Sequence, residues 1–178
     1  IVDNGVNFSV YSEAADRIEV VLFDDPESEQ ASQSFPLKRK GDVWNIYVEG
    51  IGIGQHYGYR AWGPNWTYDE EWAPGLINGF QSDVDFDGNR FNPNKLLTDP
   101  YSKALHRDHN WGGGSPASGP QRTQSTLASS SKSVIMAVDD IDSHLNGYEW
   151  SSNEDNWIEN RTTNPDWRPW NEVVIYEV

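Results

Sequence analysis

The 178-residue chain has no cysteine and only 13 Lys and Arg against 28 Asp and Glu. The lack of thiols excludes a disulfide framework, a thiolate metal site and a cysteine nucleophile. The formal net charge of -15 would repel a phosphate backbone and an anionic membrane surface, so we expect no nucleic-acid or membrane partner. No apolar run approaches the ~20 residues that a membrane helix needs. The chain also lacks an initiator methionine and a signal-like start, so we expect a piece of a longer protein and assign no compartment.

Aromatic residues, in contrast, are abundant. Nine Trp and eight Tyr accompany 15 Gly and 10 Pro, and many of the rings fall outside the expected strands. Aromatic faces stack on the apolar C–H faces of sugars, while nearby polar groups bind the hydroxyls. Any single ring is better interpreted as part of a core, but as a group the rings favour a carbohydrate context.

The first third of the chain contains short segments with the two-residue period of β-strands. Residues 6–10 alternate apolar and polar side chains, and similar runs occupy 18–23, 35–37, 43–48 and 55–62. In the second run the even-numbered residues form the inward set, and in the last run odd and even residues point to opposite faces. Turn signals about every ten residues, without a long helical pattern, predict an all-β sandwich.

The sequence changes character beyond these strands. Asn92-Pro93 and Asp99-Pro100 each place a capping residue before a proline, which predicts two single helical turns. Residues 112–132 form a low-complexity segment, and residues 133–138 regain strand character. The remainder is irregular and rich in Trp and acidic residues until a final strand begins at Val173.

Several segments together resemble a known family. The runs that carry the resemblance are Gly5–Ser12, Gly41–Trp44, Tyr57–Trp66, Ser82–Asp85, Arg90–Tyr101 and Val174–Val178. They resemble the N-terminal region of isoamylase-type glycogen and starch debranching enzymes of glycoside hydrolase family 13, and the bacterial isoamylases in particular. The resemblance implies an immunoglobulin-like early-set β-sandwich, classed as a family 48 carbohydrate-binding module, with a long irregular C-terminal extension.

The resemblance also implies a domain organisation and a catalytic partner. Residues 1–105 correspond to the sandwich, and residues 106–172 to a low-complexity loop, a returning strand and an aromatic-rich connector. Residues 173–178 correspond to the start of a catalytic (β/α)8 barrel that hydrolyses α-1,6 branch linkages in glycogen or amylopectin. A retaining glycosidase needs two carboxylates about 5–5.5 Å apart, and the resemblance places both on later barrel strands. We therefore expect an O-glycosyl hydrolase as the parent protein, and no catalytic residue in this chain.

Two roles remain open for the chain itself. It could pack on the barrel and shape or extend the glucan-binding groove, or it could be an autonomous module that tethers the enzyme to glycogen or amylopectin. The residues expected to contact glucan are Arg60, Trp62, Trp66, Tyr68 and Trp72. Glucan-binding members of the family carry a Trp after the second strand, whereas this chain continues there with Leu22-Phe23-Asp24-Asp25-Pro26.

Metal binding is expected only in the full-length enzyme. The resemblance implies calcium at the junction with the barrel, where Asp108 matches the contributing aspartate and the barrel supplies the other ligands. The run Asp83–Gly88 also looks like the start of a calcium loop, but Asn94 stands where such a loop needs a bidentate Glu, so we interpret the run as an acidic turn. His106 and His109 have no third ligand in view, and we interpret them as surface residues.

Overall fold

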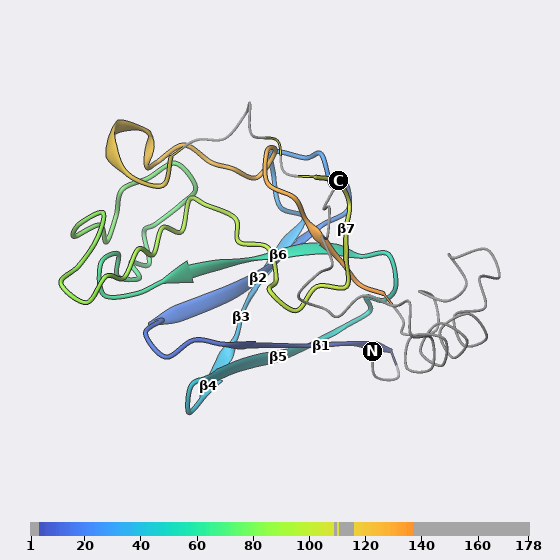
Figure 1. Ribbon diagram of the computed structural model, residues 1–178. Coiled ribbons are helices and arrows are strands. Elements are labelled where there is room, and N and C mark those ends of the chain that lie inside the picture. Colours follow the sequence, from blue (N-terminus) through green and yellow to red (C-terminus); the bar gives the residue numbers. More distant parts are fainter. Residues whose placement is uncertain (1–3, 109, 111–115, 137–178) are drawn as a thin grey trace, which may run out of the picture. The chain divides into compact units, whose positions relative to one another are not determined.

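The computed structural model describes residues 4–108, 110 and 116–136 (Figure 1). The chain divides into two units, Ile1–Ala137 and Val138–Val178, and the description concerns the first unit. The irregular region and the final strand expected after residue 138, together with His109, lie outside the described residues. In the described ranges no helix is long and apolar enough to cross a membrane.

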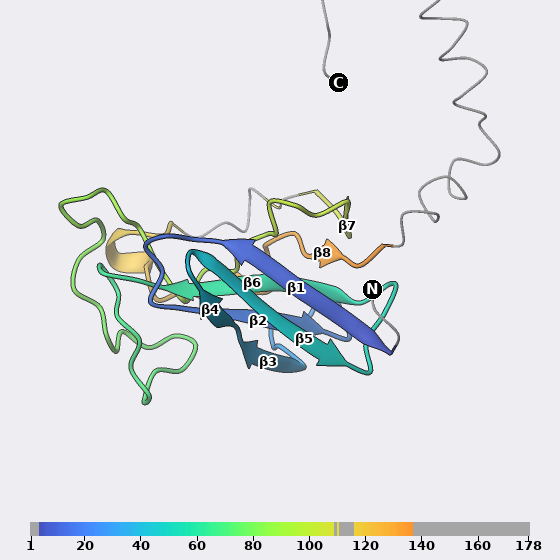
Figure 2. The same cartoon turned by 90° about the horizontal axis from the view of Figure 1, so that it is seen from below.

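Two antiparallel sheets face each other in this unit (Figures 1 and 2). The three-stranded sheet has the order β1 (Gly5–Tyr11), β5 (Val43–Glu49), β4 (Lys38–Lys40). The five-stranded sheet has the order β3 (Gln33–Pro36), β2 (Arg17–Phe23), β6 (His56–Trp62), β8 (Ser133–Val134), β7 (Ala104–Leu105). The only helix of the described residues is the short 3-10 turn η2 (Gly119–Gln121). The predicted all-β sandwich is therefore confirmed, although β4 and β7 were not expected.

The main core lies between the two sheets. The inward residues of β1 and β2 are buried there, as their alternation predicted, and the odd-numbered face of β6 joins them: Val6, Phe8, Val10, Ile18, Val20, Leu22, Tyr57, Tyr59 and Ala61. Each large apolar side chain removed from water contributes about 1.5–3 kcal/mol. Leu37, which is 6% exposed, also lies in this core, where the chain crosses from β3 in one sheet to β4 in the other.

The opposite face of the five-stranded sheet is also covered. Val21 and Phe23 on this outer face are buried and pack with Leu96 and Leu127 from distant loops. Gly58 permits the close approach, because a Cβ atom there would lie 2.8 Å from the Leu96 side chain. Loop segments from 63–102 and 116–132 thus form a third layer, and alternation alone gave no sign of it.

The two single turns predicted at the Asn-Pro and Asp-Pro pairs are present, although neither is assigned as a helix. In each turn the side chain caps the backbone: Asn92 Oδ1 accepts from the Asn94 amide at 2.9 Å and Asp99 Oδ1 from the Tyr101 amide at 2.8 Å. No helix propagates from the first turn because the Leu97 amide donates to the Tyr59 carbonyl at 2.8 Å, which ties the segment to β6.

The chain beyond residue 105 returns to the sandwich. Ser133 and Val134 of β8 pair with Tyr57 and His56 of β6 and with β7. A strand is thus present where the sequence predicted one to return, although it spans only two residues. The domain boundaries at 105 and 172 stay predictions.

Candidate functional site

A cluster of rings and guanidinium groups occupies one end of the outer face. Trp62 ends β6, and its ring meets the edges of Tyr68 at 5.4 Å and Trp72 at 5.1 Å between centroids, with interplanar angles of 87° and 88°. Tyr68 and Trp72 come from the loop after β6, where the Trp72 amide donates to the Asp69 carbonyl at 3.0 Å and closes a turn. We call Arg17, Glu19, Arg60, Trp62, Tyr68 and Trp72 the aromatic–guanidinium cluster.

The charged members of this cluster come from paired strands. Arg17 lies opposite Trp62, and Glu19 opposite Arg60, in the β2–β6 register. The Arg17 guanidinium carbon is 4.0 Å from the Tyr68 ring centroid, and that of Arg60 is 4.9 Å from the Trp72 centroid. Such cation–π contacts contribute about 0.5–2 kcal/mol, more when they are desolvated.

One carboxylate contacts both arginines. Glu19 contacts Arg17 at 2.7 Å and Arg60 at 3.9 Å, and it accepts a 2.8 Å hydrogen bond from the Ser34 hydroxyl. Burial lowers the pKa of Arg60, while the nearby Glu19 carboxylate acts in the opposite direction. The cluster thus has a largely buried base, in which one carboxylate offsets part of the charge of two arginines, and it carries two partly accessible rings.

The structure separates the five residues predicted to contact glucan by their exposure. Trp62 and Trp66 are each 1% exposed, and Arg60 is 7% exposed. Trp66 packs on Phe80 at 5.0 Å, and its indole donates to the Asn78 carbonyl at 2.7 Å. Tyr68 is 40% exposed and Trp72 half-buried, so these two rings form the accessible part of the cluster.

Sequence reasoning missed Arg17 and Glu19. Both residues lie on the same face of β2 as Val21, and they face the even-numbered residues of β6 across the register. The sequence offered part of the information needed to find them, because the alternation placed Arg60 and Trp62 on one face of an expected strand. A pairing between two particular strands, however, is not encoded in the alternation of either strand alone.

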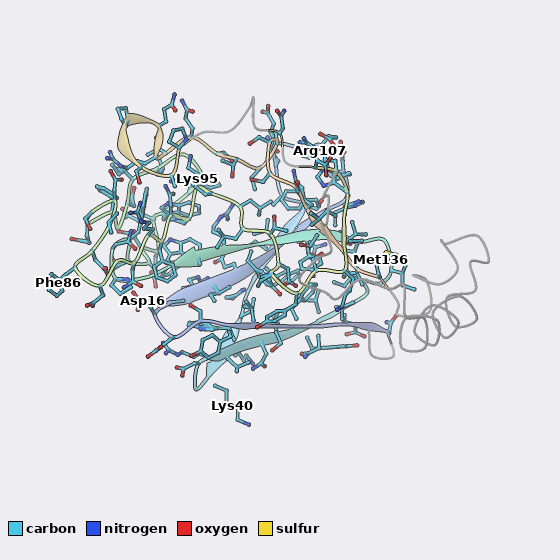
Figure 3. The ribbon with its side chains drawn as sticks, viewed as in Figure 1. Asp16, Lys40, Phe86, Lys95, Arg107 and Met136 are labelled. Atoms are coloured by element: carbon cyan, nitrogen blue, oxygen red, sulfur yellow. The ribbon has the colours of Figure 1, made fainter. Side chains whose placement is uncertain are left out.

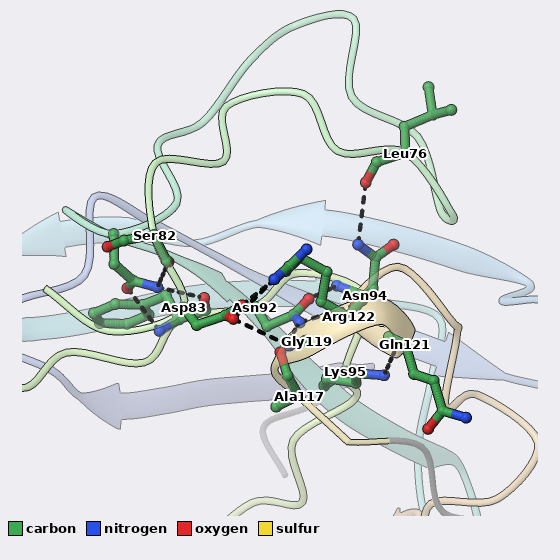
Figure 4. A network of polar contacts seen from close by, with 12 residues as sticks. Leu76, Ser82, Asp83, Asn92, Asn94, Lys95, Ala117, Gly119, Gln121 and Arg122 are labelled. Atoms are coloured by element: carbon green, nitrogen blue, oxygen red, sulfur yellow. Dashed lines mark hydrogen bonds and ion pairs between the residues drawn. The ribbon is translucent and has the colours of Figure 1, made fainter.

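A second network clamps the loops over the sheet (Figure 4). Asn92 donates to the Ala117 and Arg122 carbonyls at 2.7 and 3.0 Å, and Lys95 donates to the Gln121 and Gln124 carbonyls at 3.2 and 2.7 Å. Arg122 grips both oxygens of Asp83 at 2.7 and 2.8 Å. We call Asp83, Asn92, Lys95 and Arg122 the polar clamp. Two segments that carried the family resemblance, 82–85 and 90–101, therefore hold the loop layer in place.

The acidic turn uses its first two carboxylates within the protein. The Arg122 hydrogen bond is the main cause that lowers the pKa of Asp83 to about 2. Asp85 caps the amides of Asp87 and Asn89 at 3.0 and 2.9 Å, and Phe86 projects from the turn fully exposed (Figure 3). Among the residues that the structure describes, no three His, Asp or Glu side chains gather in a way that could hold a metal ion.

Asp108, the predicted calcium ligand, is exposed. Its calcium role stays a prediction, because the other ligands are expected from the barrel.

The interpretation of His106 as a surface residue is wrong. Its side chain is 5% exposed, and its ring lies 6.0 Å from that of His56. The Lys132 amide donates to His106 Nδ1 at 2.8 Å, and the Lys132 ammonium lies 5.0 Å from the Phe23 ring. The β7–β8 pairing buries His106, because it brings residues 106 and 132 together over the sheet. Burial, followed by the charges of His106 and Lys132, lowers the pKa of His56.

Comparison with known proteins gives a consistent result. The family model of carbohydrate-binding module 48, the isoamylase N-terminal domain, matches residues 1–102. An isoamylase from Flavobacterium sp is 45% identical over 113 residues, which cover 58% of this chain and 14% of that protein. A glycogen debranching enzyme from Salmonella schwarzengrund is 34% identical over 178 residues, which cover 98% of this chain and 21% of that protein.

The chain therefore spans about a fifth or less of the length of these curated relatives. Among solved structures, apo pullulanase from Klebsiella pneumoniae is similar to this chain with a TM-score of 0.45 and 18% identity, over 85% of this chain and 12% of that one. That likeness is too low to bear on function.

Proposed function

Since the chain belongs to the carbohydrate-binding module 48 family, whose model describes isoamylase N-terminal domains, we propose that it is the non-catalytic N-terminal domain of an α-1,6-glucan debranching hydrolase. In this role it packs on a catalytic (β/α)8 barrel and shapes or extends the groove that holds branched glucan. The observation that carries the proposal is the family match over residues 1–102, which coincides with a two-sheet sandwich.

The state of the carboxylates supports a non-catalytic role. A general acid for glycoside hydrolysis needs a raised pKa, whereas the pKa of Asp83 is lowered by Arg122. Glu19 is held between Arg17 and Arg60 on the sheet. Both groups serve structural ion pairs, and neither is poised as a general acid. We expect the isolated chain to release no reducing ends from glycogen or amylopectin.

Glucan contact is assigned to the accessible rings of the aromatic–guanidinium cluster. Tyr68 presents 40% of its surface, and Trp72 packs on the same buried Trp62 ring. A ring that is fixed by edge-to-face packing loses little conformational entropy when a sugar stacks on it. Arg60 and Trp62 then support the contact from beneath and do not themselves touch the sugar, while buried Trp66 packs on Phe80 apart from the cluster.

The test is affinity electrophoresis of the 178-residue chain through a native gel with and without amylopectin. Retardation that is lost in Tyr68→Ala, and retained in Tyr11→Ala, would favour the second role, an autonomous glucan-binding module. Tyr11 is the matched control because it is a 59% exposed tyrosine on the other sheet. Unretarded migration would favour the groove-shaping role. In that case Tyr68→Ala in the full-length parent should raise KM for amylopectin.

The proposed function fails if the full-length parent does not cleave α-1,6 linkages. Release of linear chains from amylopectin measures this directly. Hydrolysis by the 178-residue chain alone would also overturn it.

A further inference from the structure

The edges of the two sheets are protected to different degrees. β3 contains Pro36, β4 consists of Lys38, Arg39 and Lys40, and β7 spans only two residues. Proline, positive charge and shortness are the usual devices that stop an edge strand from pairing with another chain. β1 has none of them, because its seven residues, GVNFSVY, contain neither proline nor charge. Within the described residues, β1 pairs on one side only, with β5.

The free edge of β1 presents particular backbone groups. The Ser12 amide donates to the Asp42 carbonyl at 2.9 Å, and the Gly50 amide donates to the Asn4 carbonyl at 2.7 Å. Hydrogen-bonded and non-bonded pairs alternate along an antiparallel ladder. The register therefore directs the even-numbered residues of β1 toward β5, and the N–H and C=O groups of Asn7, Ser9 and Tyr11 toward the free edge.

A groove runs along this edge. One hollow of about 250 Å³ is bounded by residues 6–9 of β1 and by Asp99 and Tyr101, and another of about 330 Å³ by residues 10–12 and by apolar side chains that include Leu97. We call the two hollows together the β1 groove. Its second half is lined largely by apolar side chains, such as Val10, Ile18, Phe91, Leu97 and Pro100.

One buried hydroxyl in the β1 groove, that of Tyr59, has no hydrogen-bond partner among the described residues. Tyr59 lines both hollows and is 3% exposed. The neighbouring Tyr57 hydroxyl, in contrast, donates to Asp99 at 2.7 Å. An unpaired buried hydroxyl is costly, so the Tyr59 hydroxyl points to an occupant that supplies an acceptor.

We propose that an extended strand of the parent polypeptide, from outside these 178 residues, pairs with the free edge of β1 and fills the β1 groove. Such a strand satisfies the free backbone groups, places alternate side chains on the apolar floor and brings an acceptor to Tyr59. The chain spans 14–21% of its curated relatives, so the parent has ample polypeptide, tethered at high effective concentration. A second copy is disfavoured because each chain carries a net charge of -15. The inference rests on the proposed function in that it requires a longer parent.

Hydrogen exchange measured by mass spectrometry on residues 5–11 tests the proposal in the full-length parent and in the 178-residue chain. The amides of Asn7, Ser9 and Tyr11 should exchange about tenfold more slowly in the parent, while those that bond β5 stay protected in both. Equal exchange in the two proteins would overturn the proposal. Protection that rises with concentration in the short chain would assign the edge to a second copy, and would overturn it as well. A parent that shows the protection but no α-1,6 hydrolysis would refute only the proposed function.

Two variants sharpen the test. Ser9→Pro removes an amide that β5 does not use, whereas Ser9→Ala keeps it, so only the proline variant should lose the protection in the parent. Tyr59→Phe covers the case in which the proline variant fails to fold. It should raise the Tm of the short chain by removing the unpaired hydroxyl, yet speed exchange at the β1 edge in the parent. If Tyr59→Phe raises the Tm of the short chain and of the parent equally and leaves exchange at β1 unchanged, the Tyr59 hydroxyl does not bond the added strand.

Discussion

The two faces of the five-stranded sheet are both buried, but in different ways. The inner face meets the other sheet through apolar side chains that alternate along each strand. The outer face lies under loops that are fixed by the polar clamp, by the aromatic–guanidinium cluster and by buried lysines. The stabilisation from burying apolar side chains depends on the buried area and not on direction. Hydrogen bonds and ion pairs, in contrast, need particular partners in a particular geometry. The inner face should therefore respond to lost volume, and the outer face to lost geometry or altered charge.

The largest expected effect comes from the inner face. Phe8 is 4% exposed and meets the Tyr57 ring edge-on at 5.0 Å. Phe8→Ala should lower the free energy of unfolding by about 3–5 kcal/mol, because it leaves a cavity between the sheets. Urea unfolding measures the change, and Tyr11→Ala on the exposed side of the same strand should stay within about 0.5 kcal/mol. Equal losses would mean that β1 is not packed as described.

A methyl group tests how closely the loops approach the outer face. Gly58→Ala would place a Cβ 2.8 Å from Leu96 and 3.0 Å from the Leu97 carbonyl, so we expect a loss of about 1–3 kcal/mol. Gly52→Ala is the matched control, because nothing lies within 4 Å of its Cβ position. If both variants keep the wild-type midpoint in urea, the loop layer does not press on β6.

The charge on the outer face should make stability depend on pH. Burial lowers the pKa of Lys95 from 10.5 to about 8. Between about pH 8 and 10 the unfolded chain then holds more protons than the folded chain, so the free energy of unfolding should rise with pH, by about 1–2 kcal/mol. Above about pH 10 the trend should reverse, because the pKa values of Tyr57 and Tyr59 are raised mainly by burial and the unfolded tyrosines ionise first.

Lys95→Met tests whether Lys95 causes this rise in the free energy of unfolding. Urea unfolding of the variant at pH 8 and pH 10 measures it. The rise should shrink without vanishing, because burial also lowers the pKa of Lys132. An unchanged rise would assign the effect to other groups.

The smallest effect concerns the half-buried ion pair between Asp83 and Arg122 in the polar clamp. The pKa of Asp83 lies near 2 in place of 3.8, chiefly because Arg122 donates to it. The stabilising contribution is therefore present above about pH 4 and is lost as pH falls through the folded pKa. An NMR titration of the Asp83 carboxyl should show this low midpoint, and Arg122→Gln should return it toward 3.8. If the titration midpoint of Asp83 is the same in Arg122→Gln as in the wild type, the ion pair with Arg122 is not the cause of the low pKa.

Much of the inner face could be predicted from the sequence. Alternation identified five of the strands, assigned Val20 to the inward side and placed Tyr59 on the same face as Tyr57 and Ala61, without deciding which face of that strand is inward. It also separated Val21 and Phe23 from the inward set, but it did not reveal what covers them, because the cover comes from residues near 96 and 127. The expected single turns at Asn92 and Asp99 are present with the expected capping side chains, and pairing of Leu97 with β6 then fixes the path of the chain after the first turn.

The candidate site was predicted in part. The structure brings Arg60, Trp62, Tyr68 and Trp72 together, while Trp66 pairs with Phe80 elsewhere in the loop. Whether a ring faces sugar or core depends on its exposure, and composition carries no information on that quantity. The buried position of His106 was missed for the same reason, since residue 132, far along the chain, covers it.

The sequence by itself determined the strand periodicity, the all-β class and the segments that place the chain in its family. Only the tertiary structure decided which aromatic rings remain accessible, which lysines and histidines are buried, and which sheet edge has no partner strand among the described residues. The physical reason is the range of each interaction. Side chains two residues apart share a face through local backbone geometry, whereas coverage of that face depends on segments that meet only when the whole chain has folded.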